Sequence, residues 1–243
     1  MSVARIYQPY PINIHTSFTL DEPASHHLAR VLRVNKGDVL TLFNGRGGEY
    51  EAVITHIDKK SVHVNILSYS QREAESPLQI HLAQGIARGE KMDFIIQKAV
   101  ELGIHQITPL MTERCNVKWQ NEREEKKLKH WQAIAISACE QTGRNRIPII
   151  TPPQSFAQWL AQMDTGVRLV LTPHIEAKLP SEISKESSVV ILIGPEGGLS
   201  DQEVTASIQQ GFLPLNLGQR ILRTETASLA SIAILQYVYG DLA

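Results

Sequence analysis

The sequence has few cysteines and no long apolar run. Two cysteines, Cys115 and Cys139, occur among 243 residues, which excludes a disulfide-stabilised scaffold, and without a C-x-x-C pair there is no sign of zinc. We expect both to be small buried hydrophobes, with a catalytic thiol as the alternative. No stretch approaches the roughly 20 consecutive apolar residues of a membrane helix, and the N-terminal residues lack a leader pattern. These absences predict a cytoplasmic chain with no membrane partner.

A strong excess of one charge is also missing. Lys and Arg number 24 against 25 Asp and Glu, which leaves a formal net charge of −1 at pH 7. The whole-chain balance therefore does not indicate nucleic acid as a partner, and a local basic patch would have to supply such binding. The nine histidines are scattered along the chain, so we expect no metal site.

Residues 1–72 have the pattern of short strands. Apolar and polar residues partly alternate at 39–43, 49–57 and 61–68, and turn-forming residues separate these runs. Residues 21–32 are the one helical candidate. This part of the chain therefore predicts a small β-barrel, an architecture that does not by itself define a function.

After a polar run that ends in Pro77, the pattern changes to strands that alternate with helices. The boundary between two domains, 1–72 and 73–243, is expected at this run. Strands are expected at 78–84, 104–110, 167–171, 189–193 and 213–217, and helices at 90–102, 121–142 and 225–239. Another helix should open at Ser155, with Gln158 completing the cap and a buried stripe of Phe156, Trp159, Leu160 and Met163. This alternation predicts an α/β fold with a mainly parallel sheet covered on both faces.

A glycine-rich loop, Gly194-Pro195-Glu196-Gly197-Gly198, follows an apolar strand and precedes a helix that Ser200 and Glu203 should cap. The loop matches neither of the two phosphate-binding glycine patterns. The carboxylate of Glu196 disfavours a polyphosphate and favours a cationic or donor-rich ligand, such as S-adenosylmethionine. The alternative is a tight turn without a ligand.

A second loop, from Leu217 to Ala227, also joins a strand to a helix. We expect Thr224 to be the N-cap of this helix and Glu225 to complement the helix dipole. Arg223 gains nothing from that dipole, so it either pairs with Glu225 or Glu196 or positions a substrate base or phosphate. A third loop, Leu171-Thr172-Pro173-His174, follows another strand. Three loops at one edge of a parallel sheet predict a single ligand site.

Five stretches of the chain resemble the SPOUT class of methyltransferases, and more narrowly the 16S ribosomal RNA uridine-N3 methyltransferases called ribosomal RNA small subunit methyltransferase E. These stretches are 27–33, 88–92, 139–146, 194–198 and 217–227. The resemblance implies a PUA-like N-terminal domain, a C-terminal α/β-knot domain with a trefoil knot, and a homodimer. It implies S-adenosylmethionine as cofactor and 16S rRNA, within the 30S subunit, as substrate.

The resemblance also implies which residues hold the cofactor in the three loops. These are Leu171, Thr172, Pro173, Ile193, Gly194, Pro195, Glu196, Gly197, Gly198, Leu217, Gly218, Arg220, Ile221, Leu222 and Thr226.

Methylation at N3 requires an unpaired or extruded uridine, because N3 lies on the Watson–Crick edge. A cation beside the uracil carbonyls would favour loss of the N3 proton, and Arg223 is the candidate. Glu225 is the candidate base, with capping or ion pairing as the alternative. Seven arginines and one lysine are the candidates for RNA contacts. The alternative is that they are ordinary surface cations, and we expect this of about half of them. The candidates are Arg5, Arg30, Arg33, Arg88, Lys91, Arg114, Arg144 and Arg146.

Three other functions are compatible with parts of the pattern. One is methylation of a different RNA position, such as a ribose 2′-hydroxyl of tRNA or rRNA. Another is a non-catalytic RNA-binding factor in ribosome assembly, which would have no need of a cofactor pocket. A dinucleotide-dependent oxidoreductase is disfavoured because the dinucleotide-binding fingerprint is missing.

Overall fold

The computed structural model describes residues 3–115, 121–162, 166–173, 175, 177, 179–180, 183–184 and 187–243, with the backbone alone at 121–123. The chain forms two compact units. Unit 1 comprises Met1–Glu75 and Cys139–Ile147, and unit 2 comprises Ser76–Ala138 and Pro148–Ala243. Among the described residues, no helix is both long enough and apolar enough to cross a membrane.

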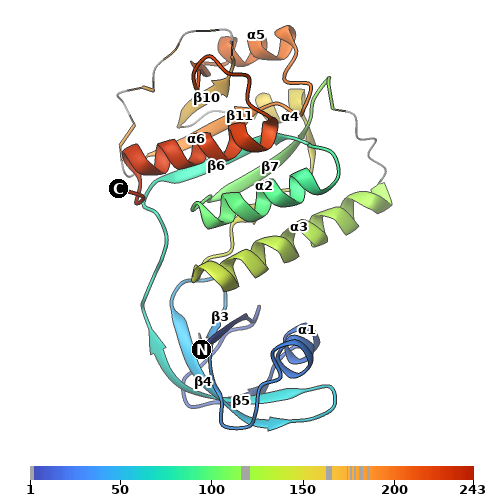
Figure 1. The fold of residues 1–243 in the computed structure, drawn as a ribbon, viewed down its shortest axis with the longest axis vertical. Coiled ribbons are helices and arrows are strands. Elements are labelled where there is room, and N and C mark those ends of the chain that lie inside the picture. The colour runs from blue at the N-terminus through green and yellow to red at the C-terminus, as the bar shows by residue number, and fades with distance from the viewer. Residues whose placement is uncertain are drawn as a thin grey trace. The chain divides into compact units, whose positions relative to one another are not determined.

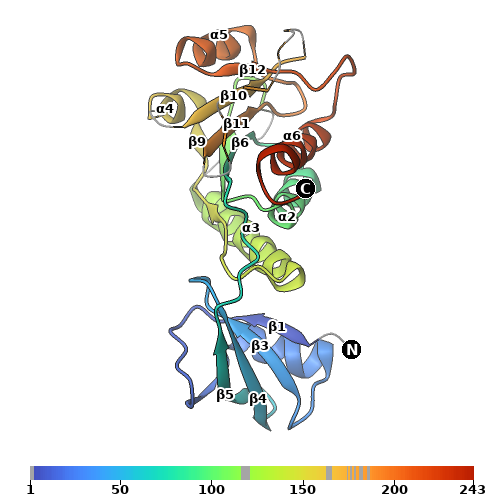
Figure 2. The same ribbon diagram turned by 90° about the vertical axis from the view of Figure 1, so that its left-hand side faces the viewer.

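Unit 1 contains a five-stranded mixed sheet with the strand order β1-β3-β4-β5-β2 (Figures 1 and 2). Its strands are β1 (Ala4–Tyr7), β2 (Ser17–Thr19), β3 (Val39–Phe43), β4 (Glu49–Ile57) and β5 (Val62–Ser70). The β1–β3 pair is parallel and the other pairs are antiparallel. Alternate residues of β3 and β5, including Leu40, Leu42, Val64 and Ile66, point into one core and are fully buried.

The single helix expected at 21–32 is divided into two pieces. Helix α1 (Glu22–His26) begins at Asp21, whose side chain accepts a hydrogen bond from the Ala24 N–H at 2.9 Å. A π-helical segment, η1 (His27–Leu32), follows and ends at Arg33 in the left-handed conformation with φ 54°. The sequence pattern does not distinguish this wider turn from an α-helix, because both place the apolar Leu28 in the core.

Unit 2 is built on a seven-stranded sheet in which every pairing is parallel. The order is β12-β10-β11-β6-β7-β8, with β9 also paired to β7. The strands are β6 (Gln79–Gly85), β7 (Gln106–Met111), β8 (Ile149–Ile150), β9 (Gln154–Ser155), β10 (Val167–Leu171), β11 (Ser188–Ile193) and β12 (Leu213–Leu215). The central strand β11 is buried at five successive positions, as expected when helices cover both faces.

Helices cover both faces of this sheet, with α4 and α5 on one side and α2 and α6 on the other (Figure 2). The helices of unit 2 are α2 (Glu90–Glu101), α3 (Asn121–Thr142), α4 (Phe156–Leu160), α5 (Asp201–Gln209) and α6 (Thr224–Tyr239). The Ser155 side chain caps α4 by accepting from the Gln158 N–H at 3.3 Å. Phe156, Trp159 and Leu160 are buried as expected, and Met163 lies outside the described residues.

Two details differ from the sequence-based expectations. The N-cap of α6 is Arg223 rather than Thr224, because the Thr224 hydroxyl donates instead to the Gly194 carbonyl oxygen at 2.7 Å. The last turn of α3 and the residues that follow it, Cys139–Ile147, belong to unit 1 although they come after the expected boundary at residue 72. The assignment of RNA binding to residues 1–72 and of methyl transfer to residues 73–243 stays a prediction.

Candidate active site

The three predicted loops meet around one cavity of about 500 Å³ at the carboxyl ends of β10 and β11. This volume falls within the roughly 300–1,000 Å³ that small-molecule sites occupy. The cavity is lined by Arg114, Leu171, Thr172, Pro173, Ile175, Ile193, Gly194, Pro195, Glu196, Gly197, Gly198, Leu199, Asp201, Val204, Thr205, Ile208, Ile221, Leu222, Thr224 and Ala227.

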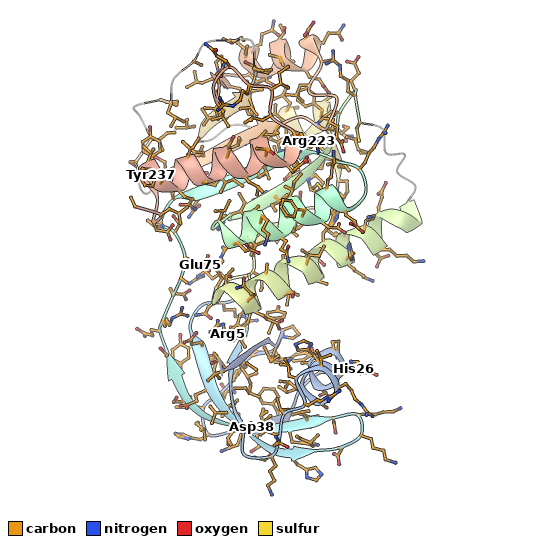
Figure 3. All side chains as sticks on the ribbon, viewed as in Figure 1. Arg5, His26, Asp38, Glu75, Arg223 and Tyr237 are labelled. Atoms are coloured by element: carbon orange, nitrogen blue, oxygen red, sulfur yellow. The ribbon has the colours of Figure 1, made fainter. Side chains whose placement is uncertain are left out.

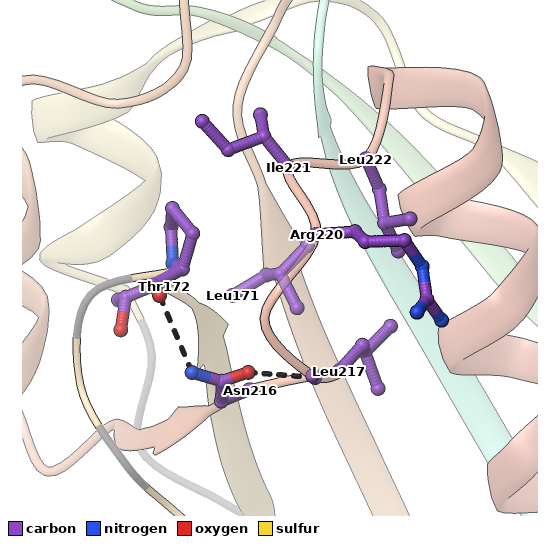
Figure 4. A pocket seen from close by; sticks show the side chains of 9 residues that line it. Leu171, Thr172, Asn216, Leu217, Arg220, Ile221 and Leu222 are labelled. Atoms are coloured by element: carbon purple, nitrogen blue, oxygen red, sulfur yellow. Dashed lines mark hydrogen bonds between the residues drawn. The ribbon is translucent and has the colours of Figure 1, made fainter.

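A smaller cavity of about 60 Å³ adjoins it between the loops that follow β10 and β12 (Figure 4). Its lining adds Asn216, Leu217, Gly218 and Arg220 to residues that also line the larger cavity. The Asn216 side-chain amide donates to the carbonyl oxygens of Pro173 at 3.3 Å and Ile175 at 3.1 Å, and its oxygen accepts from the Gly218 N–H at 2.7 Å. Asn216 therefore ties the two loops together, a role that our sequence interpretation missed. The sequence did offer a signal for this role, because asparagine is a turn-forming residue and this one lies two positions before a glycine.

The glycine-rich loop is closely packed on itself. A Cβ at Gly194 would lie 2.6 Å from the carbonyl carbon of Gly198 and from the Leu199 nitrogen, and Gly198 has φ +69°. The expected capping box between Ser200 and Glu203 is present at the start of α5. The loop is thus fixed in a shape that only glycine allows at these positions.

A carboxylate and a cation face each other beside this loop. The Glu196 Oε1 atom lies 3.5 Å from Lys91 Nζ and accepts from the Arg88 N–H at 3.0 Å. Burial raises the pKa of Glu196, but the Arg88 hydrogen bond and the Lys91 charge outweigh it and hold the pKa below its usual value. Glu196 is therefore an ionised carboxylate at the edge of the cavity.

Thr172 offers a buried hydroxyl to a ligand. The residue is 5% exposed and lines both cavities. Its Oγ1 atom is buried and has no hydrogen-bond partner among the residues that the structure describes. Since buried hydroxyls are rarely left unpaired, this oxygen points to a ligand atom as its partner.

The structure places the predicted catalytic residues at the start of α6, next to the cavity. Arg223 is exposed and lies at the N-terminal end of the helix (Figure 3), and its side chain forms no hydrogen bond or ion pair within the described parts of the chain. A pair with Glu225 or Glu196, the structural alternative, does not occur among the described residues. Glu225 Oε2 instead lies 3.9 Å from Lys91 Nζ and has no hydrogen-bond partner among the described residues.

Of the predicted cofactor residues, all but Thr226 line one of the two cavities. The lining also includes residues that our sequence interpretation did not select, namely Ile175, Leu199, Asp201, Val204, Thr205, Ile208, Asn216, Thr224 and Ala227. Arg114, expected to contact RNA, donates to the Gly197 carbonyl oxygen at 3.1 Å and contributes to the larger cavity.

The predicted RNA-contacting cations divide into two groups. Arg144 is buried and pairs with Glu75 at 2.6 Å, while Arg5 pairs with Glu49 and donates to Asn145 Oδ1, each at 2.6 Å. These contacts hold unit 1 together, so we correct the expectation and leave both arginines out of the proposed RNA-binding surface. The exposed members are Arg30, Arg33, Arg88, Arg114 and Arg146, whereas Lys91 is partly buried and lies 3.5 Å from Glu196.

Neither cysteine has the features of a catalytic thiol. Burial raises the pKa of the Cys139 thiol to about 12, so it is not a nucleophile at neutral pH. Cys115 is partly buried and its thiol donates to the Ile86 carbonyl oxygen at 3.5 Å. The burial expected for Cys139 is confirmed.

Comparison with known protein families shows the class of protein to which this sheet and cavity belong. Residues 74–236 match the RNA methyltransferase domain family, and residues 20–67 match the RNA methyltransferase PUA domain family. These matches confirm the expected fold class, a small PUA-like domain followed by an α/β-knot domain with a mainly parallel sheet.

Individual relatives narrow this class. The chain is 40% identical over 241 residues to ribosomal RNA small subunit methyltransferase E of Buchnera aphidicola subsp. Schizaphis graminum, covering 99% of this chain and 98% of that one. It is 32% identical over 230 residues to the Bacillus subtilis protein of the same name, covering 91% and 90%. The Neisseria gonorrhoeae protein of that name, solved bound to S-adenosyl methionine, superimposes with TM-score 0.93 at 38% identity and full coverage of both chains. The chain belongs to the ribosomal RNA small subunit methyltransferase E family.

Proposed function

We propose that this chain transfers a methyl group from S-adenosylmethionine to N3 of a uridine in 16S ribosomal RNA. The observation that carries the proposal is the single cavity formed by three loops at the carboxyl edge of the parallel sheet. Family membership supports the reaction class, and relatives solved with S-adenosyl methionine bound support the cofactor. The N3 position and the cytoplasm as location follow from the family resemblance.

The residues around the cavity suit this cofactor. S-adenosylmethionine supplies the reactive methyl group on its sulfonium when it is bound. The ionised Glu196 at the cavity edge complements positive charge, and the unpaired Thr172 hydroxyl provides a hydrogen bond. Apolar side chains in the cavity wall, such as Leu171, Ile193 and Leu222, suit the flat adenine ring of the cofactor and would exclude water from it. We assign cofactor binding to the predicted residues that line the two cavities.

Arg223 is positioned to act on the substrate base. It is an exposed arginine with no partner among the described residues, and it immediately precedes Thr224, which lines the cavity. A guanidinium beside a uracil carbonyl oxygen stabilises the negative charge that develops when N3 loses its proton. Glu225 is our candidate for the proton acceptor, because its Oε2 atom lies near Lys91 and has no hydrogen-bond donor in the described residues.

RNA contacts are assigned to the exposed arginines of each unit. Arg30 and Arg33 lie on or next to η1, and Arg146 follows α3. Arg88 and Arg114 lie near the glycine-rich loop, where they contact Glu196 and Gly197. Such contacts fix the position of the RNA backbone rather than its sequence. The assembled small subunit is the proposed substrate, because it presents a defined RNA shape.

A homodimer is proposed from an exposed apolar face of unit 2. Helices α2 and α6 pack against each other and leave Phe94 45%, Tyr237 64% and Val238 51% exposed. Apolar surface of this kind marks an interaction site, and a second copy of the chain is the partner implied by the family resemblance.

Purified protein tests the reaction directly. We expect heat of binding when S-adenosylmethionine is titrated in, and transfer of a labelled methyl group to small subunits prepared from cells that lack this chain. Methyl groups found on ribose 2′-oxygens would favour the alternative target. A chain that binds small subunits but neither binds the cofactor nor transfers a methyl group would be an assembly factor.

A further inference from the structure

A buried glutamine connects three elements next to the cofactor cavity. Gln84 lies at the end of β6 and is 0% exposed. Its side-chain nitrogen donates to the Thr224 hydroxyl at 3.0 Å and to the Gly85 carbonyl oxygen at 2.8 Å, and lies 3.3 Å from the Gly194 carbonyl oxygen. Its side-chain oxygen accepts from the Ser228 hydroxyl. One side chain thus links β6, the glycine-rich loop and the start of α6.

The carbonyl oxygen of Gly194 is the centre of this network. It accepts from the Thr224 hydroxyl at 2.7 Å and is also reached by the Gln84 amide. The backbone is packed closely at the same point, because a Cβ at Gly85 would lie 2.5 Å from the Pro195 nitrogen. A shift of the glycine-rich loop relative to α6 would therefore break the hydrogen bonds of fully buried groups, and buried unpaired groups are costly.

Gln84 does not itself line the cavity, whereas its partners Gly194 and Thr224 do. The glutamine can therefore affect a ligand only by holding these two residues in place. Thr224 also directly follows Arg223, so the same contacts fix the starting point of the helix that carries the proposed substrate-binding arginine.

We propose that Gln84 is a positioning residue that sets the spacing between the glycine-rich loop and α6 and so keeps the cofactor pocket in its binding shape. This inference rests on the proposed function, since it names a residue that prepares that site. Nothing in the sequence pattern singles out Gln84, because it lies in a strand that would otherwise pack apolar side chains.

The test compares full-length variants by calorimetric titration with S-adenosylmethionine and by thermal unfolding. Gln84→Met keeps the length of the side chain and removes its hydrogen bonds, and we expect the Kd to rise about tenfold. Ser228→Ala removes the donor to the Gln84 oxygen, together with the hydrogen bond from the Ser228 hydroxyl to the Thr224 carbonyl oxygen at 2.9 Å. It leaves the Gln84 amide bonds in place, so it should raise the Kd by a smaller factor, about threefold. The control is Ser231→Ala. Ser231 is also a buried serine of α6 that donates to the carbonyl oxygen four residues earlier, but it has no recorded contact with Gln84.

A double-mutant cycle separates positioning from loss of stability. Thr224→Val should raise the Kd, whereas Thr224→Ser should keep it within about twofold of the wild-type value. The double variant with Gln84→Met and Thr224→Val should have a Kd close to that of Thr224→Val alone, because both substitutions act through one network. If the wild type binds the cofactor, two results would overturn this inference and leave the proposed function standing. One is an unchanged Kd in Gln84→Met, and the other is an equal loss of affinity in Ser228→Ala and Ser231→Ala. A wild-type chain that does not bind the cofactor would overturn the proposed function and this inference with it.

Discussion

Arg223 is the residue whose proposed role differs most from an ordinary structural one. Its side chain is exposed at the start of α6 and has no partner among the residues that the structure describes. If it stabilises the uracil anion, Arg223→Ala should lower kcat by about 100-fold or more, the usual effect of removing one group that stabilises developing charge. The Kd for S-adenosylmethionine should stay near the wild-type value. Single-turnover methylation of small subunits and calorimetry measure the two quantities.

The matched control for this substitution is Lys127→Ala, in an exposed position on the charged face of α3. That variant should retain wild-type turnover. If Arg223→Ala also retains it, Arg223 has no part in the mechanism.

His81 gives unit 2 a pH-dependent stability. The ring lies in β6 with its Nε2 atom 2.9 Å from the Thr108 hydroxyl oxygen, and burial lowers its pKa from 6.5 to about 4. The unfolded chain therefore binds a proton between pH 6.5 and 4 that the folded chain does not. The stability contribution is present above pH 6.5 and is lost as the pH falls through this window, by about 2 kcal/mol at pH 5.

Urea unfolding at pH 7.5 and pH 5 measures this effect. His81→Gln cannot titrate, so its free energy of unfolding should fall by about 2 kcal/mol less than that of the wild type over the same interval. Parallel losses in the two proteins would show that other groups control the acid sensitivity.

At the scale of elements, the segment Cys139–Ile147 holds unit 1 together. Its Arg144 side chain is 5% exposed and pairs with Glu75 at 2.6 Å. Arg144→Ala leaves the Glu75 carboxylate without its partner, so we expect a loss of about 3 kcal/mol in the free energy of unfolding. Affinity for RNA, measured on the folded fraction, should be nearly unchanged.

Arg146, two residues further on, is the natural comparison. Its side chain is 56% exposed, and its one ion pair among the described residues is long, with 3.9 Å between the Arg146 guanidinium and Glu73 Oε1. Arg146→Ala should change stability by less than about 0.5 kcal/mol and weaken RNA binding. The opposite pattern in the two variants would return Arg144 to the RNA-binding surface.

Periodicity predicted the long regular elements well, because burial of an apolar face decides them. The strands at 39–43 and 49–57 and the helix at 121–142 have the predicted bounds. The two-residue strands β8 and β9 were not predicted, since two residues carry no period.

The site was predictable only where chain order alone brings loops together. Loops after parallel strands share one edge, so the cavity followed from the pattern. Long-range partners did not follow. The pairing of Arg144 with Glu75 and the network around Gln84 join residues far apart in sequence, and a residue type alone does not reveal such contacts.

At the scale of the whole molecule, the exposed face of α2 and α6 predicts the oligomeric state. Tyr237 is 64% exposed at the C-terminal end of α6 (Figure 3). Tyr237→Lys places a charge in the proposed dimer interface, so we expect light scattering to report a dimer for the wild type and a monomer for the variant. Tyr10→Lys, at a tyrosine 59% exposed in unit 1, should remain dimeric. A wild-type monomer would exclude the homodimer.

The central claim concerns one modified nucleotide. Mass spectrometry of nucleosides and fragments from 16S rRNA compares cells that lack this chain with the same cells carrying the wild-type gene or Arg223→Ala. The account predicts that one N3-methyluridine disappears in the deletion strain, returns with the wild-type gene and does not return with Arg223→Ala. An identical set of 16S rRNA modifications with and without the chain would contradict it.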